Sequence, residues 1–193
     1  MLDLNLWEQA AKFHGHKCPG LAIGFKASEG AIDQLGLSAK DWPAFDEEIV
    51  CVTENDACGV DAIQLILSCT FGKSNLITRL RGKMAFSFFI RNNEAGNNKC
   101  GATKRAVRLV LTAKSPLGAS REEFMNYLLS TPYDNLFSIK EPHYDLPESA
   151  RMFKSHDCAA CGESTAEYAL RVQDSRLVCA DCYNAYDREG LGG

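Results

Sequence analysis

Two pairs of cysteines near the C-terminus constrain the fold of this chain more than any other feature. Cys158 pairs with Cys161 and Cys179 with Cys182, each across two residues, and 17 residues separate the two pairs. This spacing is typical of a tetrahedral zinc site in which each pair supplies two thiolates from one tight turn. Because a segment of about 36 residues cannot bury a self-sufficient core, we expect the ion to supply most of its folding free energy.

The residues around these cysteines predict a small zinc module. Ala166 to Val172 and Ser175 to Val178 are expected to pair as a hairpin across a polar turn, and Tyr183 to Glu189 to form a short helix. A cysteine-pair turn, a hairpin, a second cysteine-pair turn and a helix follow one another in this order, which is typical of a treble-clef or zinc-ribbon domain. Since four cysteines leave no open coordination position, we expect structural zinc.

The remaining sequence is long enough for one full domain. The chain has 193 residues, 46% of them hydrophobic, and its chemistry changes near residue 150. We therefore expect a core domain at 1–150 and a four-cysteine zinc-binding domain at 151–193. The chain has nine cysteines, and their grouping is typical of metal and thiol chemistry rather than of disulfides. It has no apolar run of about 18 residues and no secretory N-terminal pattern. We therefore expect a cytoplasmic protein without a membrane span.

Hydrophobic periodicity predicts an α+β core, with helices on a mixed or antiparallel sheet. The expected helices are Leu4 to Phe13, Pro19 to Gly36, Gly59 to Cys69 and Ser120 to Leu129, and the expected strands are Ile49 to Thr53, Lys83 to Arg91 and Ala106 to Thr112. Residues 131–150, with three prolines, are expected to form an extended connector. Gly20, Gly24 and Gly30 weaken the second helix, which indicates that another element approaches it closely.

His14, His16 and Cys18 place two imidazoles and one thiol within five residues. This stretch falls at the predicted joint between the first two helices, where a glycine and irregular backbone let these groups converge on one ion. Cys18 directly precedes Pro19, so the positive end of the second helix, together with Lys17, should lower the pKa of the thiol and favour the thiolate.

Cys58 has similar surroundings, because it precedes the helix predicted from Gly59 and has Asp61 in the first turn of that helix. Two helix starts that face each other would form a small polar cleft that holds all of these groups. We predict that a second transition metal, for which zinc is one candidate, is bound by His14, His16, Cys18 and Cys58. The predicted catalytic residues are Cys18, Cys58, His16 and Asp61.

These motifs closely resemble those of the FmdE family, which takes its name from a component of formylmethanofuran dehydrogenase. The resemblance covers roughly residues 5–140 and rests on His14-Gly15-His16-Lys17-Cys18-Pro19-Gly20, Gly24, Cys58 to Gln64 and Gly72 to Leu76. It implies an α+β domain with a zinc-finger-like domain appended, an intertwined homodimer, and a metal or active site in a groove lined by the shared histidines and cysteines. It also implies a place in a dehydrogenase system whose molybdenum or tungsten pterin and iron-sulfur clusters lie in other, oxidoreductase subunits.

The sequence thus favours a metal-binding accessory or catalytic protein of redox or one-carbon metabolism, with an unidentified small-molecule substrate. Whether the chain is itself an enzyme stays open. One alternative is a non-catalytic zinc-finger module that docks on a protein or nucleic-acid partner. Another is metal-free thiol chemistry between Cys18 and Cys58.

Charge separates these alternatives in part. Residues 1–72 carry 4 basic and 11 acidic side chains, whereas residues 73–114 carry 10 basic and 1 acidic, and the whole chain has a net charge of -4. The negative total disfavours nucleic acid as a partner.

We expect Lys73 to place a positive charge near the cleft, Cys51 and Cys69 to be packing residues, and Cys100 to lie in an exposed loop.

Overall fold

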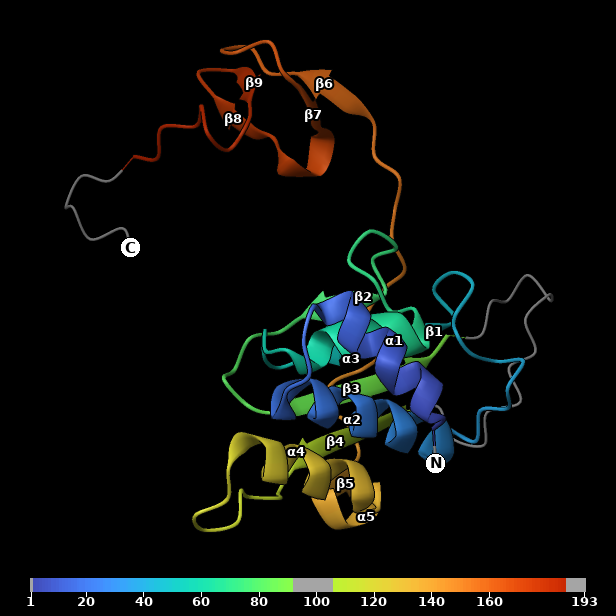
Figure 1. The fold of residues 1–193 in the computed structure, drawn as a ribbon. Coiled ribbons are helices and arrows are strands. Elements are labelled where there is room, and N and C mark those ends of the chain that lie inside the picture. The colour runs from blue at the N-terminus through green and yellow to red at the C-terminus, as the bar shows by residue number, and fades with distance from the viewer. Residues whose placement is uncertain (1, 92–105, 187–193) are drawn as a thin grey trace. The chain divides into compact units, whose positions relative to one another are not determined.

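The computed structural model describes residues 2–91 and 106–186 of the chain. The chain divides into two compact units, Met1–Ser149 and Ala150–Gly193, which are described separately below (Figure 1). Among the described residues, no helix is both long enough and apolar enough to cross a lipid bilayer.

The first unit is built on a five-stranded sheet with the strand order β2-β1-β3-β4-β5. The strands are β1 (Ile49–Thr53), β2 (Leu76–Thr78), β3 (Ala85–Ile90), β4 (Ala106–Leu111) and β5 (Phe137–Lys140). Only β1 and β2 are parallel, and the other neighbours are antiparallel. The mixed sheet confirms the α+β class that the sequence predicts.

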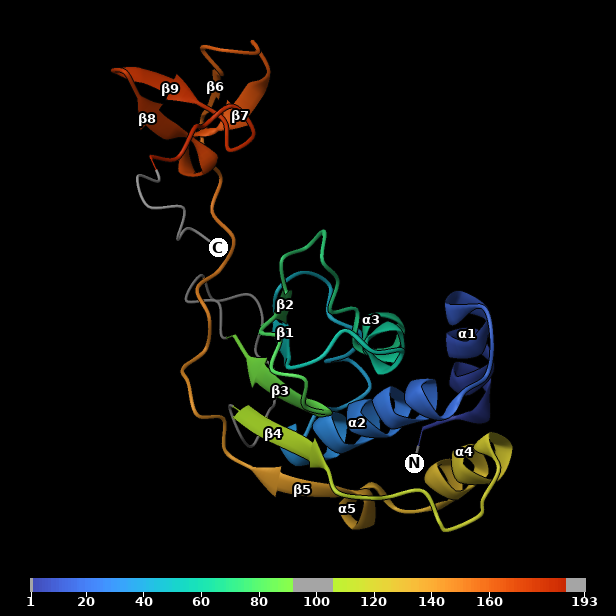
Figure 2. The same ribbon diagram turned by 90° about the vertical axis from the view of Figure 1, so that its left-hand side faces the viewer.

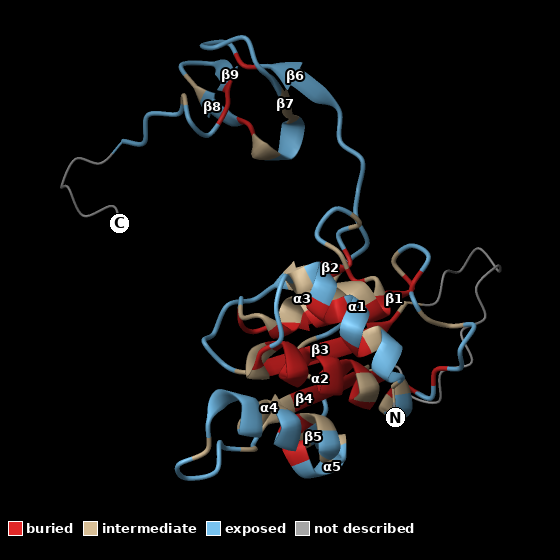
Figure 3. Cartoon of the chain, viewed as in Figure 1, coloured by how far each residue is buried: buried red, intermediate tan, exposed pale blue. Residues whose placement is uncertain are grey.

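Helices cover one face of this sheet (Figure 2). They are α1 (Leu4–His14), α2 (Pro19–Leu35), α3 (Gly59–Leu67), α4 (Arg121–Ser130) and the short α5 (Tyr133–Leu136). Their ends follow the local sequence: Asp3 caps α1, Pro19 opens α2, and Ser120 and Glu123 form a complete capping box at α4. Buried residues concentrate in α2 and in the strands behind it, so α2 is the centre of the core (Figure 3).

Glycines let α3 pack directly against the backbone of α2. A Cβ atom at Gly24 would lie 1.9 Å from the carbonyl oxygen of Gly59, and one at Gly59 would lie 3.0 Å from the backbone nitrogen of Gly24. A Cβ at Gly30 would lie 2.9 Å from side-chain atoms of Leu109 and Tyr133. The close approach that the glycines predict is therefore present along α2.

The second face of the sheet carries a smaller apolar cluster and a buried ion pair. Val50, Val52 and Phe89 pack there with Tyr144, whose hydroxyl donates a hydrogen bond to Ser87. Nearby, the guanidinium of Arg108 donates two hydrogen bonds, of 2.7 and 2.9 Å, to the two carboxylate oxygens of Glu54. Only 5% of either side chain is exposed. Loss of either charge would therefore leave the other buried without a partner and would destabilise the fold.

The expectation of an extended connector at 131–150 is wrong over residues 133–140. These residues form α5 and then β5, which pairs with β4 at Leu111 and Phe137. Pro132 ends α4, as expected, but it also serves as the N-cap of α5. Residues 141–150 have no helix or strand, so over this part the expected connector is present.

The second unit consists of two small hairpins. They pair β6 (Ser155–Asp157) with β7 (Ser164–Ala166) and β8 (Arg171–Gln173) with β9 (Arg176–Val178). Cys158 and Cys161 lie between the strands of the first hairpin, and Cys179 and Cys182 follow the second. Two hairpins that each present a cysteine pair are consistent with a zinc ribbon.

Two details of the predicted zinc module differ. The strand expected over Ala166 to Val172 is interrupted by the 3-10 turn η1 (Glu167–Ala169). The helix expected at Tyr183 to Glu189 is absent through Tyr186, and its last residues lie outside the described part of the chain. The described tail therefore follows the zinc-ribbon pattern and lacks the helix of a treble clef.

Replacing Gly24 with alanine should destabilise the first unit by about 2–4 kcal/mol, because the new Cβ would force α2 and α3 apart. Gly72→Ala is the matched control, since no atom lies within 4 Å of a Cβ at Gly72, and it should change stability by less than about 0.5 kcal/mol. Urea denaturation measures both. Equal midpoints for the two variants would contradict the close-packing argument.

Acid should weaken the first unit partly through Glu54. The hydrogen-bonded guanidinium of Arg108, supported by the charges of Lys83 and Arg79, holds the pKa of Glu54 below its ordinary value of 4.5. A carboxyl whose pKa is lower in the folded chain contributes stability above pH 4.5 and loses it as pH falls through the folded-state pKa.

The variant Glu54→Gln should therefore be less stable at pH 7 by about 3–5 kcal/mol, because Arg108 loses its buried partner. Its stability should also change less between pH 7 and pH 3 than that of the wild type. Urea denaturation at both pH values tests this, with the exposed Glu141→Gln as control. An unchanged pH dependence in Glu54→Gln would show that Glu54 does not carry the acid sensitivity.

Candidate functional site

The joint between α1 and α2 brings three metal-ligating side chains together. α1 ends at His14, Gly15 turns the chain with a φ of 95°, and Cys18 is the N-cap of α2. One ligand atom each from His14, His16 and Cys18 lies within 4.8 Å of the others. Nε2 of His14 is 3.9 Å from Sγ of Cys18, and the two imidazole rings are 4.5 Å apart. We refer to these three residues as the His/Cys cluster.

The first turn of α3 orients one imidazole of this cluster. Nδ1 of His14 lies 2.7 Å from a carboxylate oxygen of Asp61, and the side-chain amide of Gln64 donates a hydrogen bond of 3.1 Å to the other oxygen. A carboxylate on Nδ1 selects the tautomer that is protonated there. The lone pair of Nε2 therefore faces Cys18.

Cys18 caps the start of α2 with its sulfur, and Cys58 lies beside it. Sγ of Cys18 accepts a hydrogen bond of 3.3 Å from the backbone N–H of Leu21 in the first turn of α2. Burial raises the pKa of the Cys58 thiol, and its hydrogen bond with Cys18 raises this pKa further. A Cβ at Gly20 would meet both sulfurs, at 3.5 Å from Cys58 and 3.8 Å from Cys18, so the glycine leaves room for the thiol pair.

Two cavities border these residues. The α2–α4 cavity has a volume of about 530 Å³ and is lined by His16, Lys17, Cys18, Pro19, Arg121, Glu122 and Met125. The strand-end cavity has a volume of about 330 Å³ and is lined by His14, Thr53, Asn55, Asp56, Ala57, Cys58, Val60, Asp61 and Thr78. Both contain members of the His/Cys cluster, so small molecules can reach it.

The structure thus brings His14, His16, Cys18, Cys58 and Asp61 into one region, although Cys58 lies outside the three-residue ligand group. The expectation that Lys73 lies near the cleft is wrong. Its ammonium donates to the carbonyl of Ala44 and to Ser68, the C-cap at the opposite end of α3.

Sequence reasoning gave no role to Gln64, Arg121 or Met125. The i, i+3 spacing of Gln64 and Asp61 on one helix could have indicated their contact. Arg121 and Met125 reach the cavity through the packing of α4 beside α2, which no local pattern encodes.

Cys51 and Cys69 are packing residues, as expected. Cys51 and Cys69 are fully buried, and burial raises the pKa of Cys69 to about 12. Cys100 lies outside the described residues.

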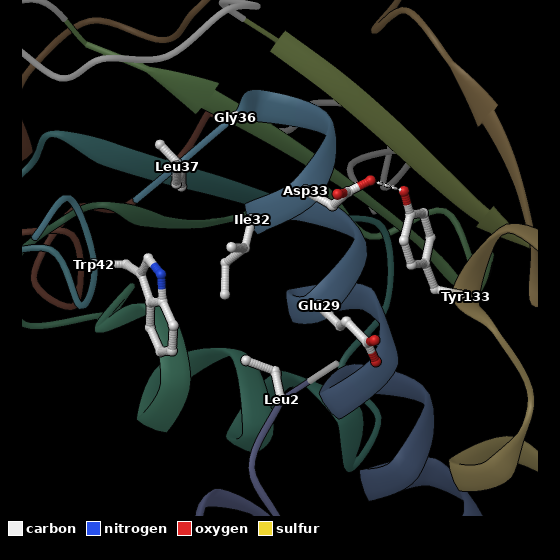
Figure 4. Close-up of a pocket in the computed structure, with 8 residues that line it drawn as sticks. All are labelled: Leu2, Glu29, Ile32, Asp33, Gly36, Leu37, Trp42 and Tyr133. Carbon is white, nitrogen blue, oxygen red and sulfur yellow. Dashed lines mark hydrogen bonds between the residues drawn. The ribbon is translucent and has the colours of Figure 1, made fainter. Parts of the chain in front are cut away.

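A further cavity, of about 300 Å³, lies at the C-terminal part of α2 (Figure 4). It is lined by Leu2, Glu29, Ile32, Asp33, Gly36, Leu37, Trp42 and Tyr133. Figure 4 shows the hydroxyl of Tyr133 on the carboxylate of Asp33. No thiol or imidazole lines this cavity, so it offers no soft or borderline metal ligand.

The four tail cysteines form the second cluster. Their sulfur atoms all lie within 4.8 Å of one another. Backbone N–H groups, first that of Cys161 and then that of Cys179, lower the pKa of Cys158 to about 6, whereas hydrogen bonds that the Cys182 thiol donates to the sulfurs of Cys179 and Cys161 raise its pKa to about 12. Four thiolates this close repel one another unless a cation sits among them, so the donor set fits a metal ion.

The fold and the two clusters define a metal-binding α+β protein with an appended ribbon. The family model described as "FmdE, Molybdenum formylmethanofuran dehydrogenase operon" matches residues 13–138. The chain therefore belongs to the FmdE family, which confirms the resemblance seen in the sequence.

Two known proteins are similar to most of the chain. A "Probable S-adenosyl-L-methionine-binding protein" of Archaeoglobus fulgidus is 29% identical over 202 residues, which cover 95% of this chain and 54% of the relative. The chain thus spans about half the length of that protein. The crystal structure of a tungsten formylmethanofuran dehydrogenase FmdE-like protein from Syntrophus aciditrophicus has a TM-score of 0.57 at 22% identity, covering 91% of this chain and 88% of that one. This structural likeness supports the fold.

Chelation should unfold the tail and leave the first unit folded. Apart from cysteines, the apolar cluster of the ribbon contains Val178. Because so small a core contributes little stability, we expect the ion to hold the two hairpins together. Amide hydrogen exchange on the full chain, with and without a strong chelator, should show loss of protection confined to residues 155–182. Cys161→Ser should give the same pattern without chelator, and a tail that stays protected in both cases would contradict it.

Proposed function

We propose that the chain is a metal-dependent catalytic protein of redox or one-carbon metabolism. In this proposal His14, His16 and Cys18 bind a transition-metal ion, and the four tail cysteines bind a structural zinc ion. The observation that carries the proposal is that the ligand atoms of these three residues lie within 4.8 Å of one another. Asp61 orients one of the two imidazoles, that of His14.

The number of ligands distinguishes the two centres. Four cysteines close a tetrahedral shell, whereas two histidines and one cysteine leave a position for water or substrate. A borderline ion such as zinc fits this nitrogen and sulfur donor set. When bound, such an ion supplies Lewis acidity or an activated water.

The protein residues have separable roles in this proposal. Asp61 holds the His14 ring with Nε2 toward the ligand group, and Gln64 holds Asp61. The N–H of Leu21 stabilises negative charge on Cys18. Cys58, beside Cys18, is placed to contact a substrate bound at the open position.

The family and its relatives support the metabolic setting. The family description names the formylmethanofuran dehydrogenase operon, and a homodimer with oxidoreductase partner subunits in the cytoplasm belongs to the same proposal. S-adenosyl-L-methionine is left out of the proposal, because about half of the relative named for it has no counterpart in this chain.

Thiol chemistry is a second candidate, favoured by the two sulfurs of Cys18 and Cys58, which both lie within 4 Å of the Cβ position at Gly20. In this reaction the two thiols reduce a disulfide substrate: one thiolate attacks a substrate sulfur, the second resolves the mixed disulfide, and two substrate thiols leave. The protein is left with a Cys18–Cys58 disulfide, so one equivalent of a model disulfide is reduced per chain. This candidate predicts that Cys58→Ser abolishes this stoichiometric reduction while the metal content of the protein stays unchanged.

Metal analysis of the purified full-length protein tests the main proposal. We expect two ions per chain in the wild type, and one in His16→Ala and in Cys18→Ser. His16 is exposed, so its variant should fold, and the exposed His143→Ala is the matched control that keeps two ions. Asp61→Asn should weaken the core ion by about 10- to 100-fold.

Replacing Cys161 and Cys182 together should remove the tail ion and leave the core ion bound. A single ion in the wild type, with unchanged binding in His16→Ala and Cys18→Ser, would overturn the proposed core centre.

A further inference from the structure

The α2–α4 cavity is the more spacious of the two that border the His/Cys cluster, with about 530 Å³ against about 330 Å³. It lies where α4 packs beside the beginning of α2 (Figure 2). His16 and Cys18 belong both to its lining and to the proposed ligand set. A molecule in this cavity would therefore contact the reactive centre.

Charge distinguishes the two cavities. The α2–α4 cavity is lined by the cations Lys17 and Arg121 and by one carboxylate, Glu122. The strand-end cavity has two carboxylates, Asp56 and Asp61, and no lysine or arginine in its lining. An anion is therefore favoured in the first cavity over the second.

Within the α2–α4 cavity, Arg121 is the cation that remains available. Lys17 is held by Glu8 in an ion pair of 2.6 Å. Among the described residues, no carboxylate lies within ion-pair distance of the Arg121 guanidinium, which is exposed at the first residue of α4. The backbone start of that helix is already capped by Ser120 and Glu123, so the guanidinium is the group left to bind a ligand.

The rest of the lining selects the kind of anion. Pro19 and Met125, both half-buried, supply apolar surface beside the guanidinium. One available guanidinium matches a single negative charge, and its planar fork matches a carboxylate in two parallel hydrogen bonds. A phosphate dianion would need more donors than this cavity offers.

We propose that the α2–α4 cavity binds a small organic carboxylate, with its charged group on Arg121 and its carbon chain on Pro19 and Met125. This inference rests on the proposed function, since it names the substrate class of that centre. Arg121 acts as a specificity-determining residue, and the carbon chain extends toward His16 and Cys18.

Methyl NMR on methionine-labelled full-length protein tests the inference, because the chain has only 4 methionines. The Met125 signal, assigned through Met125→Leu, should shift and saturate on titration with butyrate. Butyramide, which has nearly the same shape without the charge, should bind at least tenfold more weakly, and so should inorganic phosphate. Arg121→Gln should weaken butyrate binding about tenfold or more, whereas Arg81→Gln, outside the cavity, should not.

The titration is run on protein with and without bound metal, so that it is separable from the metal analysis. Selective butyrate binding that depends on Arg121 supports the inference, even if the core ion proves absent and the proposed function fails. Equal binding of butyramide, tighter binding of phosphate, no shift of Met125, or unchanged binding in Arg121→Gln would each overturn it, whatever the metal content.

Discussion

The direct backbone contact between α2 and α3 is the constraint on which the site depends. With no side chain at Gly24 or Gly59, the two helices approach until a Cβ at Gly24 would overlap the carbonyl of Gly59. This contact brings the starts of both helices together, and their N-cap residues are Cys18 and Cys58. Asp61, one turn into α3, then reaches His14. Helix packing thus sets the spacing of groups that lie forty or more residues apart in the chain.

Thiols lie close together in both units, and their surroundings shift the pKa values of several of them. In the tail, neighbouring sulfurs raise the pKa of Cys182 to about 12 while backbone donors lower that of Cys158 to about 6. In the core, the pKa of Cys58 is raised beside Cys18. The two differ in access, because the core cluster borders two cavities. Similar ligand types can therefore stabilise the fold of the tail and, in the first unit, be accessible to small molecules.

Local patterns predicted those parts of the molecule that local chemistry determines. The capping box at Ser120, the proline that opens α2 and the two cysteine pairs each indicated their structure correctly. The fifth strand was missed because it depends on pairing with β4 rather than on its own pattern. The cavity beside Cys18 could not be predicted, since Arg121 comes from α4, about a hundred residues away. Lys73 was misplaced because sequence order does not say which end of α3 it reaches.

His14, His16 and Cys18 lie within five residues of the sequence, whereas the four tail cysteines come from two hairpins. Residues so near in sequence could capture an ion before the chain has folded, and an ion that also binds the unfolded chain stabilises the native state less. If His14, His16 and Cys18 bind an ion as proposed, the hydrogen bond from His14 to Asp61, which forms only on folding, would favour binding to the native chain. The core site should therefore be able to take up metal during synthesis, whereas the ribbon should bind its ion only as its two hairpins come together.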